Sequence, residues 1–362
     1  MTKKPLTAAL LAFVLTLAVA DGVASWASDI FALSFRGYHD NAVFMQAPVQ
    51  GLGYVWKPGA RIWGTWINPQ GLRSDELEIN TTSPRIAFLG DSVTAGQRGP
   101  LNGTLPMVVG RFMEAPVHGY EIINAGLSGT NALQQAAFLE HTVLPLKPDV
   151  VVWVFTPTHL SSPHTTMDSS DAAFHEIETE AWLKSQRERE AGEALHLRLP
   201  GKPWLREHSL LYGFSANVWH NSLVILKVRP PENRALEASK HRREIEQLAL
   251  GEGEPWRIVS QGLRRMEELA LREGFQLKIV YIPPREHVEA GSDPLSEQLL
   301  PRLAKDRWVL DLAPLLIQEA SGSPDGARAL YMDASHLNAK GVELCARAIA
   351  ESRGLVRAGG RP

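Results

Sequence analysis

Five short apolar segments, separated by stretches with helical periodicity, constrain the fold of this chain more than any other feature. Residues 85–90 (RIAFLG) are apolar after the arginine and end in glycine, as is typical of a strand buried on both faces of a sheet. Similar runs occupy residues 120–124, 150–155, 277–282 and 308–312. Helical patterns occupy residues 105–113, 132–144, 256–272, 295–305 and 339–351. Strands that alternate with helices predict an α/β fold, a three-layer α/β/α sandwich with a five-stranded parallel sheet.

The spacing of these segments predicts the domain organisation. About 120 residues separate the third and fourth apolar runs, far more than one crossover connection needs. We therefore expect a helical insertion at about residues 160–250, which forms a lid, a partner surface or a passive layer on the core. Residues 27–80, rich in aromatic residues and glycine, read as an N-terminal extension of short strands and turns. The main domain is expected over residues 81–356.

The N-terminus has the layout of an export signal. Lys3 and Lys4 precede an uncharged, mostly apolar run over residues 5–20, which ends in Ala18-Val19-Ala20, a pattern similar to a signal-peptidase site. Residues 1–26 are therefore predicted to be a signal peptide or an uncleaved membrane anchor. In either case the rest of the chain is expected on the periplasmic or extracellular side.

Charge and cysteine content exclude several classes of protein. The formal net charge is −3, so the chain lacks the basic excess that nucleic-acid binding requires. Its one cysteine, Cys345, rules out an internal disulfide and is expected to be a small buried apolar residue. His159 and His164 are close in sequence, but no carboxylate or cysteine completes a metal-ligand spacing, so we expect neither a metal nor a cofactor. Both histidines are expected at the mouth of the cleft or in solvent.

A serine and an Asp/His pair are the candidate catalytic groups. Ser92 follows Gly90-Asp91 directly after the first apolar run, and catalytic groups gather at the carboxyl ends of strands in open α/β sheets. A serine hydroxyl needs a base, and Asp333 and His336, three residues apart in a turn before the last helix, offer one. Asp333 would hold one imidazole nitrogen of His336 and leave the other for Ser92.

These motifs resemble the blocks of the SGNH (GDSL) hydrolase family. Gly90-Asp-Ser92 is similar to its first block, and Asp333-x-x-His-Leu-Asn338 to its last. Asn124-Ala-Gly-Leu-Ser-Gly-Thr-Asn131, after the second run, matches another block, in which Gly126 takes the position of a glycine whose N–H binds the oxyanion. Asn68-Pro-Gln-Gly-Leu-Arg73 is similar to a segment that often leads into the domain in exported bacterial members. The resemblance implies a flavodoxin-like sandwich and a Ser92–His336–Asp333 triad.

One block departs from the family. The family places an asparagine after the third strand, where its side chain completes the oxyanion hole, and Thr158 stands there in this chain. A threonine hydroxyl donates one hydrogen bond but is shorter than an amide. The loss of one oxyanion donor typically lowers turnover about 10²–10³-fold. The sequence leaves open whether Thr158 serves, another group such as Asn131 replaces it, or catalysis is slow.

Three functions remain open at this point. The first is hydrolysis of an acyl ester, in a small molecule or an envelope glycan or lipid, through an acyl-enzyme on Ser92. The second is transfer of the acyl group to a polysaccharide hydroxyl by the same triad, since acceptor choice depends on how the cleft admits water. The third is an inactive envelope binding or assembly protein on the same fold, because fold alone does not establish function.

Overall fold

The computed structural model describes residues 43–49, 51–62, 65–78, 82–96, 99–115, 119–160 and 243–355, together with Val117 and six residues between 16 and 23. Most of the predicted signal or anchor and most of the predicted insertion lie outside these residues. In the part of the chain that is described, no helix has the length and apolar character needed to span a membrane. The chain divides into two compact units, and the second (Met45–Gly59, Thr65–Ile177 and Arg234–Pro362) contains the five-stranded sheet and the residues of the candidate site.

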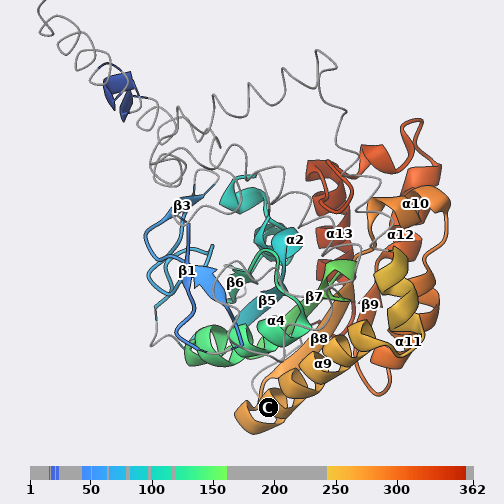
Figure 1. Cartoon of the computed structure of the whole chain (residues 1–362), viewed down its shortest axis with the longest axis horizontal. Helices are drawn as coiled ribbons and strands as arrows, with labels where there is room; N and C mark the ends of the chain where they lie inside the picture. Colours follow the sequence, from blue (N-terminus) through green and yellow to red (C-terminus); the bar gives the residue numbers. More distant parts are fainter. Residues whose placement is uncertain are drawn as a thin grey trace, which may run out of the picture. The chain divides into compact units, whose positions relative to one another are not determined.

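A five-stranded parallel sheet forms the centre of this unit (Figure 1). Its strands run in the order β6-β5-β7-β8-β9, which is the flavodoxin-like order 2-1-3-4-5. The strands are β5 (Arg85–Gly90), β6 (Glu121–Gly126), β7 (Val150–Phe155), β8 (Gln276–Tyr281) and β9 (Val309–Asp311). Every residue of β5 and β7 is buried, so these central strands are covered on both faces, as their continuous apolar sequence predicts. The predicted α/β/α fold class is confirmed.

Helices cover the two faces of the sheet in separate layers. On one face α3 (Leu105–Phe112) packs against α13 (Ala339–Glu351), and on the other α4 (Ala132–Phe138) packs against α9 (Glu254–Glu273). Alternate residues along a strand point to opposite faces. Accordingly Phe88 and Val152 belong to the core beneath α3 and α13, while the Trp153 indole donates to Gln135 of α4. Cys345 lies on the buried face of α13, as expected, and burial raises the pKa of its thiol to about 12.

Shorter elements complete the described structure, and several differ from their predicted bounds. The patterns at 132–144 and 295–305 each contain a π-helical turn, at Leu139–Val143 and Leu295–Leu299, so neither is one regular helix. The structure also contains two helices that the sequence analysis missed, α10 (Arg285–Ala290) and α12 (Ala313–Ser321). The remaining elements are β1 (Phe44–Gln46), β2 (Tyr54–Trp56), β3 (Arg61–Ile62), β4 (Thr65–Trp66), α2 (Ser92–Ala95), α11 (Leu300–Leu303) and short 3₁₀ turns at Leu101–Gly103, Leu144–Leu146, Pro157–Leu160 and Gly326–Ala329.

Part of the aromatic N-terminal segment packs on the turn that follows β6. The Tyr54 hydroxyl donates to the Ser128 carbonyl, and the Trp56 indole donates to the Gly126 carbonyl at 2.9 Å. Trp56 is completely buried, so its ring is part of the core. Residues 45–59 and 65–78 therefore form one compact unit with the sheet.

Candidate active site

Ser92 lies at the carboxyl end of a central strand and begins a one-turn helix. β5 ends at Gly90, Asp91 caps the helix through a hydrogen bond from the Val93 N–H to its Oδ1 (2.9 Å), and Ser92 is the first residue of α2. The first N–H groups of a helix have no partner within it. Ser92 therefore presents both a hydroxyl and a backbone donor at this edge of the sheet.

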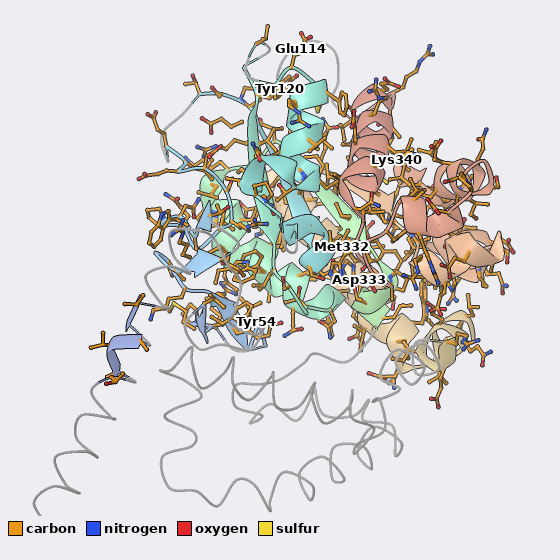
Figure 2. All side chains as sticks on the ribbon, turned by 90° about the horizontal axis from the view of Figure 1, so that it is seen from above. Tyr54, Glu114, Tyr120, Met332, Asp333 and Lys340 are labelled. Atoms are coloured by element: carbon orange, nitrogen blue, oxygen red, sulfur yellow. The ribbon has the colours of Figure 1, made fainter. Side chains whose placement is uncertain are left out.

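The structure brings Ser92, His336 and Asp333 into one hydrogen-bonded chain. His336 Nε2 lies 2.8 Å from Ser92 Oγ, across 244 residues of sequence, and His336 Nδ1 lies 2.9 Å from both Asp333 carboxylate oxygens. Met332 and Asp333 lie in the segment that leads into α13 (Figure 2). A proton on Nδ1 is held by the carboxylate, which leaves the Nε2 lone pair for the serine proton.

A tight turn fixes the Asp333 carboxylate. Its Oδ1 accepts hydrogen bonds from the backbone N–H groups of Ser335 and His336, both at 2.9 Å. Burial alone raises the pKa of Asp333, but hydrogen bonds from the His336 ring and these two N–H groups outweigh burial and lower it well below its usual range. These contacts therefore stabilise the folded chain fully at any pH above the ordinary pKa of a carboxyl group. The stabilisation is lost as the pH falls through the lowered pKa of Asp333.

Replacement of Asp333 by Asn tests this turn. Asp333→Asn is expected to lower kcat for ester hydrolysis about 10³–10⁴-fold, because a neutral amide stabilises neither the required tautomer nor the imidazolium. KM is expected to change little, since the side chain acts through His336. Steady-state kinetics and far-UV circular dichroism check both points. A fall of less than tenfold in a folded variant would contradict an orienting role for Asp333.

A second polar network lies beneath the serine and centres on the buried carboxylate of Asp91. Its Oδ2 accepts hydrogen bonds from the hydroxyls of Thr156 (2.9 Å) and Thr158, both on the segment after β7. Asp91 is 1% exposed. The network therefore joins the loop after β5 to the loop after β7 and fixes the helix that begins at Ser92.

The hydroxyl of Thr158, the expected oxyanion donor, lies in this network. It contacts both Asp91 Oδ2 and the Thr156 hydroxyl, at 2.5 Å from the latter. Thr158→Val is therefore expected to lower kcat/KM less than about tenfold, the effect of losing one of several hydrogen bonds to Asp91. A fall of 10²-fold or more with unchanged thermal stability would instead identify Thr158 as a direct donor to the oxyanion.

The backbone amide of Gly126 is also engaged. It donates to Asn124 Oδ1 at 3.0 Å, so the structure does not direct it to the serine site. Gly126 is required for a different reason, because a Cβ here would lie 2.1 Å from the backbone nitrogen of Ala95 in α2. Asn131 caps α4 through a hydrogen bond from Gln134 N–H, and its Nδ2 is buried without a hydrogen-bond partner among the described residues.

His159 is neither at the cleft mouth nor in solvent, and that expectation is wrong. It is completely buried, with its ring stacked on Trp153 at 5.8 Å between centroids and its Nε2 3.6 Å from Asp91 Oδ2. Burial lowers its pKa to about 4 despite the opposing charge of Asp91. The His159 imidazole is therefore uncharged near neutral pH and packs beside Asp91 in the interior. His164 lies outside the described residues.

The sequence analysis missed the role of Arg73. Its side chain is completely buried and donates to the carbonyl groups of Ala95, Gly96 and Gly99, which end α2 and lead away from it. Arg73 ends the segment that resembles an entry into the domain in exported relatives. The arginine at the end of that segment was the available signal. A guanidinium group has five N–H donors, so once it is buried it requires several acceptors.

One group of side chains has the spacing of metal ligands. Within the described ranges, the one group of three side chains with metal-ligand spacing is Glu246, Glu286 and His287. None of the three is hydrogen bonded to Ser92, Asp333 or His336 in the contacts given above.

Comparison with known proteins gives structural matches alone. No family model and no curated protein matches the chain. Three similar solved structures are a protein assigned to the G-D-S-L lipolytic family from Desulfitobacterium hafniense, the acetyl xylan esterase AlAXEase, and the acetylxylan esterase Axe2 from Geobacillus stearothermophilus. They are 14%, 14% and 15% identical to this chain, with TM-scores of 0.38, 0.40 and 0.29. The matches cover 74%, 72% and 78% of this chain and 97%, 96% and 100% of theirs.

The strand order and the positions of the polar groups agree with the resemblance carried by the sequence blocks. The serine follows the first strand of a flavodoxin-like sheet, and the Asp/His pair precedes the last helix and meets the serine at the carboxyl edge. The chain therefore has a flavodoxin-like α/β/α fold, with its serine and Asp/His pair at the positions that the sequence blocks predict.

Proposed function

We propose that this protein is a serine ester hydrolase that acts through an acyl-enzyme on Ser92. The observation that carries the proposal is the continuous hydrogen-bonded chain from Ser92 Oγ through His336 to Asp333. A protein that kept the fold only for binding has no need of this alignment. The aligned hydrogen bonds of Ser92, His336 and Asp333 thus favour an enzyme over an inactive binding protein.

The proposed reaction has two halves. His336 Nε2 takes the Ser92 proton as Oγ attacks the acyl carbonyl carbon, and the resulting imidazolium returns the proton to the departing alcohol. Water then attacks the acyl carbon with His336 again as base, and the acid leaves as Ser92 recovers its proton. Asp333 stays ionised throughout and stabilises the imidazolium.

The oxyanion donors are proposed from the backbone. The Ser92 N–H at the start of α2 is one. The Gly126 N–H donates to Asn124 Oδ1, and the Leu127 N–H donates to the Gly90 carbonyl. The second donor is therefore sought among the residues of the turn that follows Leu127. Gly90 pairs with Gly126, so this turn extends beside Asp91 and Ser92, and Gly129 in it has φ 76°, a conformation that favours glycine. We propose the second donor in this turn, at Ser128 or Gly129.

A small cavity lies beside the catalytic turn. It measures about 10 Å³ and is lined by Thr156, Pro157, Thr158, Ile282, Pro283, Pro284 and Ser335. A space of this size holds about one water, so it does not by itself select the acyl group. The predicted export signal supports an acylated envelope glycan, lipid or extracellular ester as the substrate.

Release of p-nitrophenol from acetate, butyrate and octanoate esters tests the proposal. We expect release that depends on Ser92, with a chain-length profile that reports the size of the acyl pocket. We also expect a fluorophosphonate to label Ser92, as located by mass spectrometry of the labelled peptide. Ser321→Ala, an exposed serine on α12, is the matched control and is expected to leave both results unchanged. No release above the Ser92→Ala background from folded protein would contradict the proposal. Acyl product on an added methyl glycoside would instead identify a transferase.

A further inference from the structure

A buried cluster of ionisable side chains lies on α10, and the proposed reaction uses none of it. His287 Nε2 lies 3.0 Å from Glu246 Oε2, and His287 Nδ1 lies 3.1 Å from Asp293 Oδ1. Glu246 belongs to the helical residues 243–250, which return the chain from the predicted insertion. The imidazole therefore lies between two carboxylates from different parts of the chain.

Three hydrogen bonds fix the carboxylate of Asp293 beside the His287 ring. Its Oδ2 accepts from the Tyr281 hydroxyl at 2.8 Å, and its Oδ1 accepts from the Leu295 and Ser296 N–H groups at 2.9 and 3.2 Å. This fixed carboxylate lies 3.1 Å from Nδ1 and can orient the ring. Nε2 is hydrogen bonded to Glu246 Oε2 at 3.0 Å, so a metal at this position would replace the proton on Nε2.

Two glutamates, Glu246 and Glu286, lie beside His287. One ligand atom each from Glu246, Glu286 and His287 lies within 4.8 Å of the other two. Glu246 is only 4% exposed, and its Oε1 has no hydrogen-bond partner in the described part of the chain. A buried carboxylate oxygen without a partner is costly, so Oε1 has lone pairs available for a further ligand.

We propose that Glu246, Glu286 and His287 bind a divalent transition metal, with Zn²⁺ as the best fit. Imidazole nitrogen and carboxylate oxygen are zinc ligands, and two carboxylates balance the charge of the ion. A tetrahedral site with bonds of about 2.05 Å places its ligand atoms about 3.3 Å apart, which small side-chain movements reach from the present spacing. Water completes the fourth position.

The ion would join the end of the insertion to the catalytic turn. Glu246 anchors residues 243–250, while Glu286 and His287 lie on α10, whose first residue, Arg285, donates its N–H to the Ala334 carbonyl at 3.0 Å. Ala334 directly follows Asp333. A metal on α10 thus stabilises the turn that holds the proposed base.

A proton competes with the metal for this position. Burial lowers the pKa of His287, but its hydrogen bonds to Asp293 and Glu246 and their negative charge raise it to about 9. Metal binding at Nε2 releases that proton to solvent. Bound metal must therefore be measured directly, rather than inferred from stability alone.

Zinc binding to the chelator-treated, dialysed full chain tests the site. We expect one Zn²⁺ per chain in competition with a chromophoric zinc chelator, and a higher Tm with zinc than without. Glu286→Gln and His287→Gln are each expected to weaken this binding at least tenfold and to abolish the rise in Tm. The matched control is His141→Gln, an exposed histidine beside Glu140, which should bind zinc as the parent chain does.

Two outcomes would overturn the proposal. One is the absence of stoichiometric zinc on the parent chain, and the other is equal zinc affinity in Glu286→Gln and the parent, which would place the ion on other histidines. Circular dichroism reports whether each variant folds. If His287→Gln does not fold, Glu286→Gln decides, because Glu286 is only partly buried. Neither readout depends on ester hydrolysis, so this proposal and the proposed function fail separately.

Discussion

Ser92→Ala and His336→Ala are each expected to lower kcat/KM for p-nitrophenyl acetate by about 10⁴-fold or more, and the double variant no further. The two side chains act as one unit, since the 2.8 Å hydrogen bond between them carries the proton that makes the serine a nucleophile. Removal of either therefore removes the same step. Strongly non-additive losses are the general behaviour of residues that share one catalytic step.

Steady-state kinetics on the two single variants and the double variant measure this non-additivity. Ser321→Ala again serves as the control, because its hydroxyl is exposed and bonds only within α12. Losses that multiply in the double variant would show that Ser92 and His336 act independently. An active Ser92→Ala protein would place the nucleophile elsewhere in the chain.

Gly126→Ala is expected to destabilise the fold by about 3 kcal/mol or more, which is at the upper end for an added methyl group. The new Cβ would lie 2.1 Å from Ala95 N, 2.6 Å from Ala95 Cα and 2.7 Å from the Thr94 carbonyl carbon. All three are backbone atoms, so no side chain can rotate to relieve the contact. α2 must move away from β6, and Ser92 moves with it.

Chemical denaturation measures the lost stability, and fluorophosphonate labelling measures the displacement of Ser92. Gly99→Ala is the matched control, because a Cβ there meets no atom within 4 Å. It is expected to unfold at the same denaturant concentration as the parent chain. A Gly126→Ala protein with parental stability would show that α2 and β6 are not in close contact.

The sheet could be predicted from the sequence because its strands are continuous apolar runs. β5 and β7 coincide with predicted segments, since strands buried on both faces leave no polar residue to obscure their ends. The last helix, α13, also has its predicted bounds, with Asn338 as its cap. Ser92, Asp333 and His336 were predicted as a set because each occupies a recognisable position beside such an element.

Features that depend on three-dimensional contacts could not be predicted. The short α10 and α12 carry too few turns to show helical periodicity. The burial of His159 depends on Trp153 and Gln135, which come from the neighbouring strand and a helix. The hydrogen bond from the Gly126 N–H to Asn124 Oδ1 depends on the rotamer of Asn124, which the spacing of residues in the sequence does not predict. The catalytic roles of the three site residues remain predictions.

The long separation between Ser92 and His336 also determines when the proposed enzyme acquires its reactivity. The nucleophile leaves the ribosome 244 residues before its base, a delay of about 12–50 s at 5–20 residues per second. Throughout that interval the serine is an ordinary alcohol. A nascent or truncated product that lacks His336 therefore carries the nucleophile without the base that the proposed acylation requires.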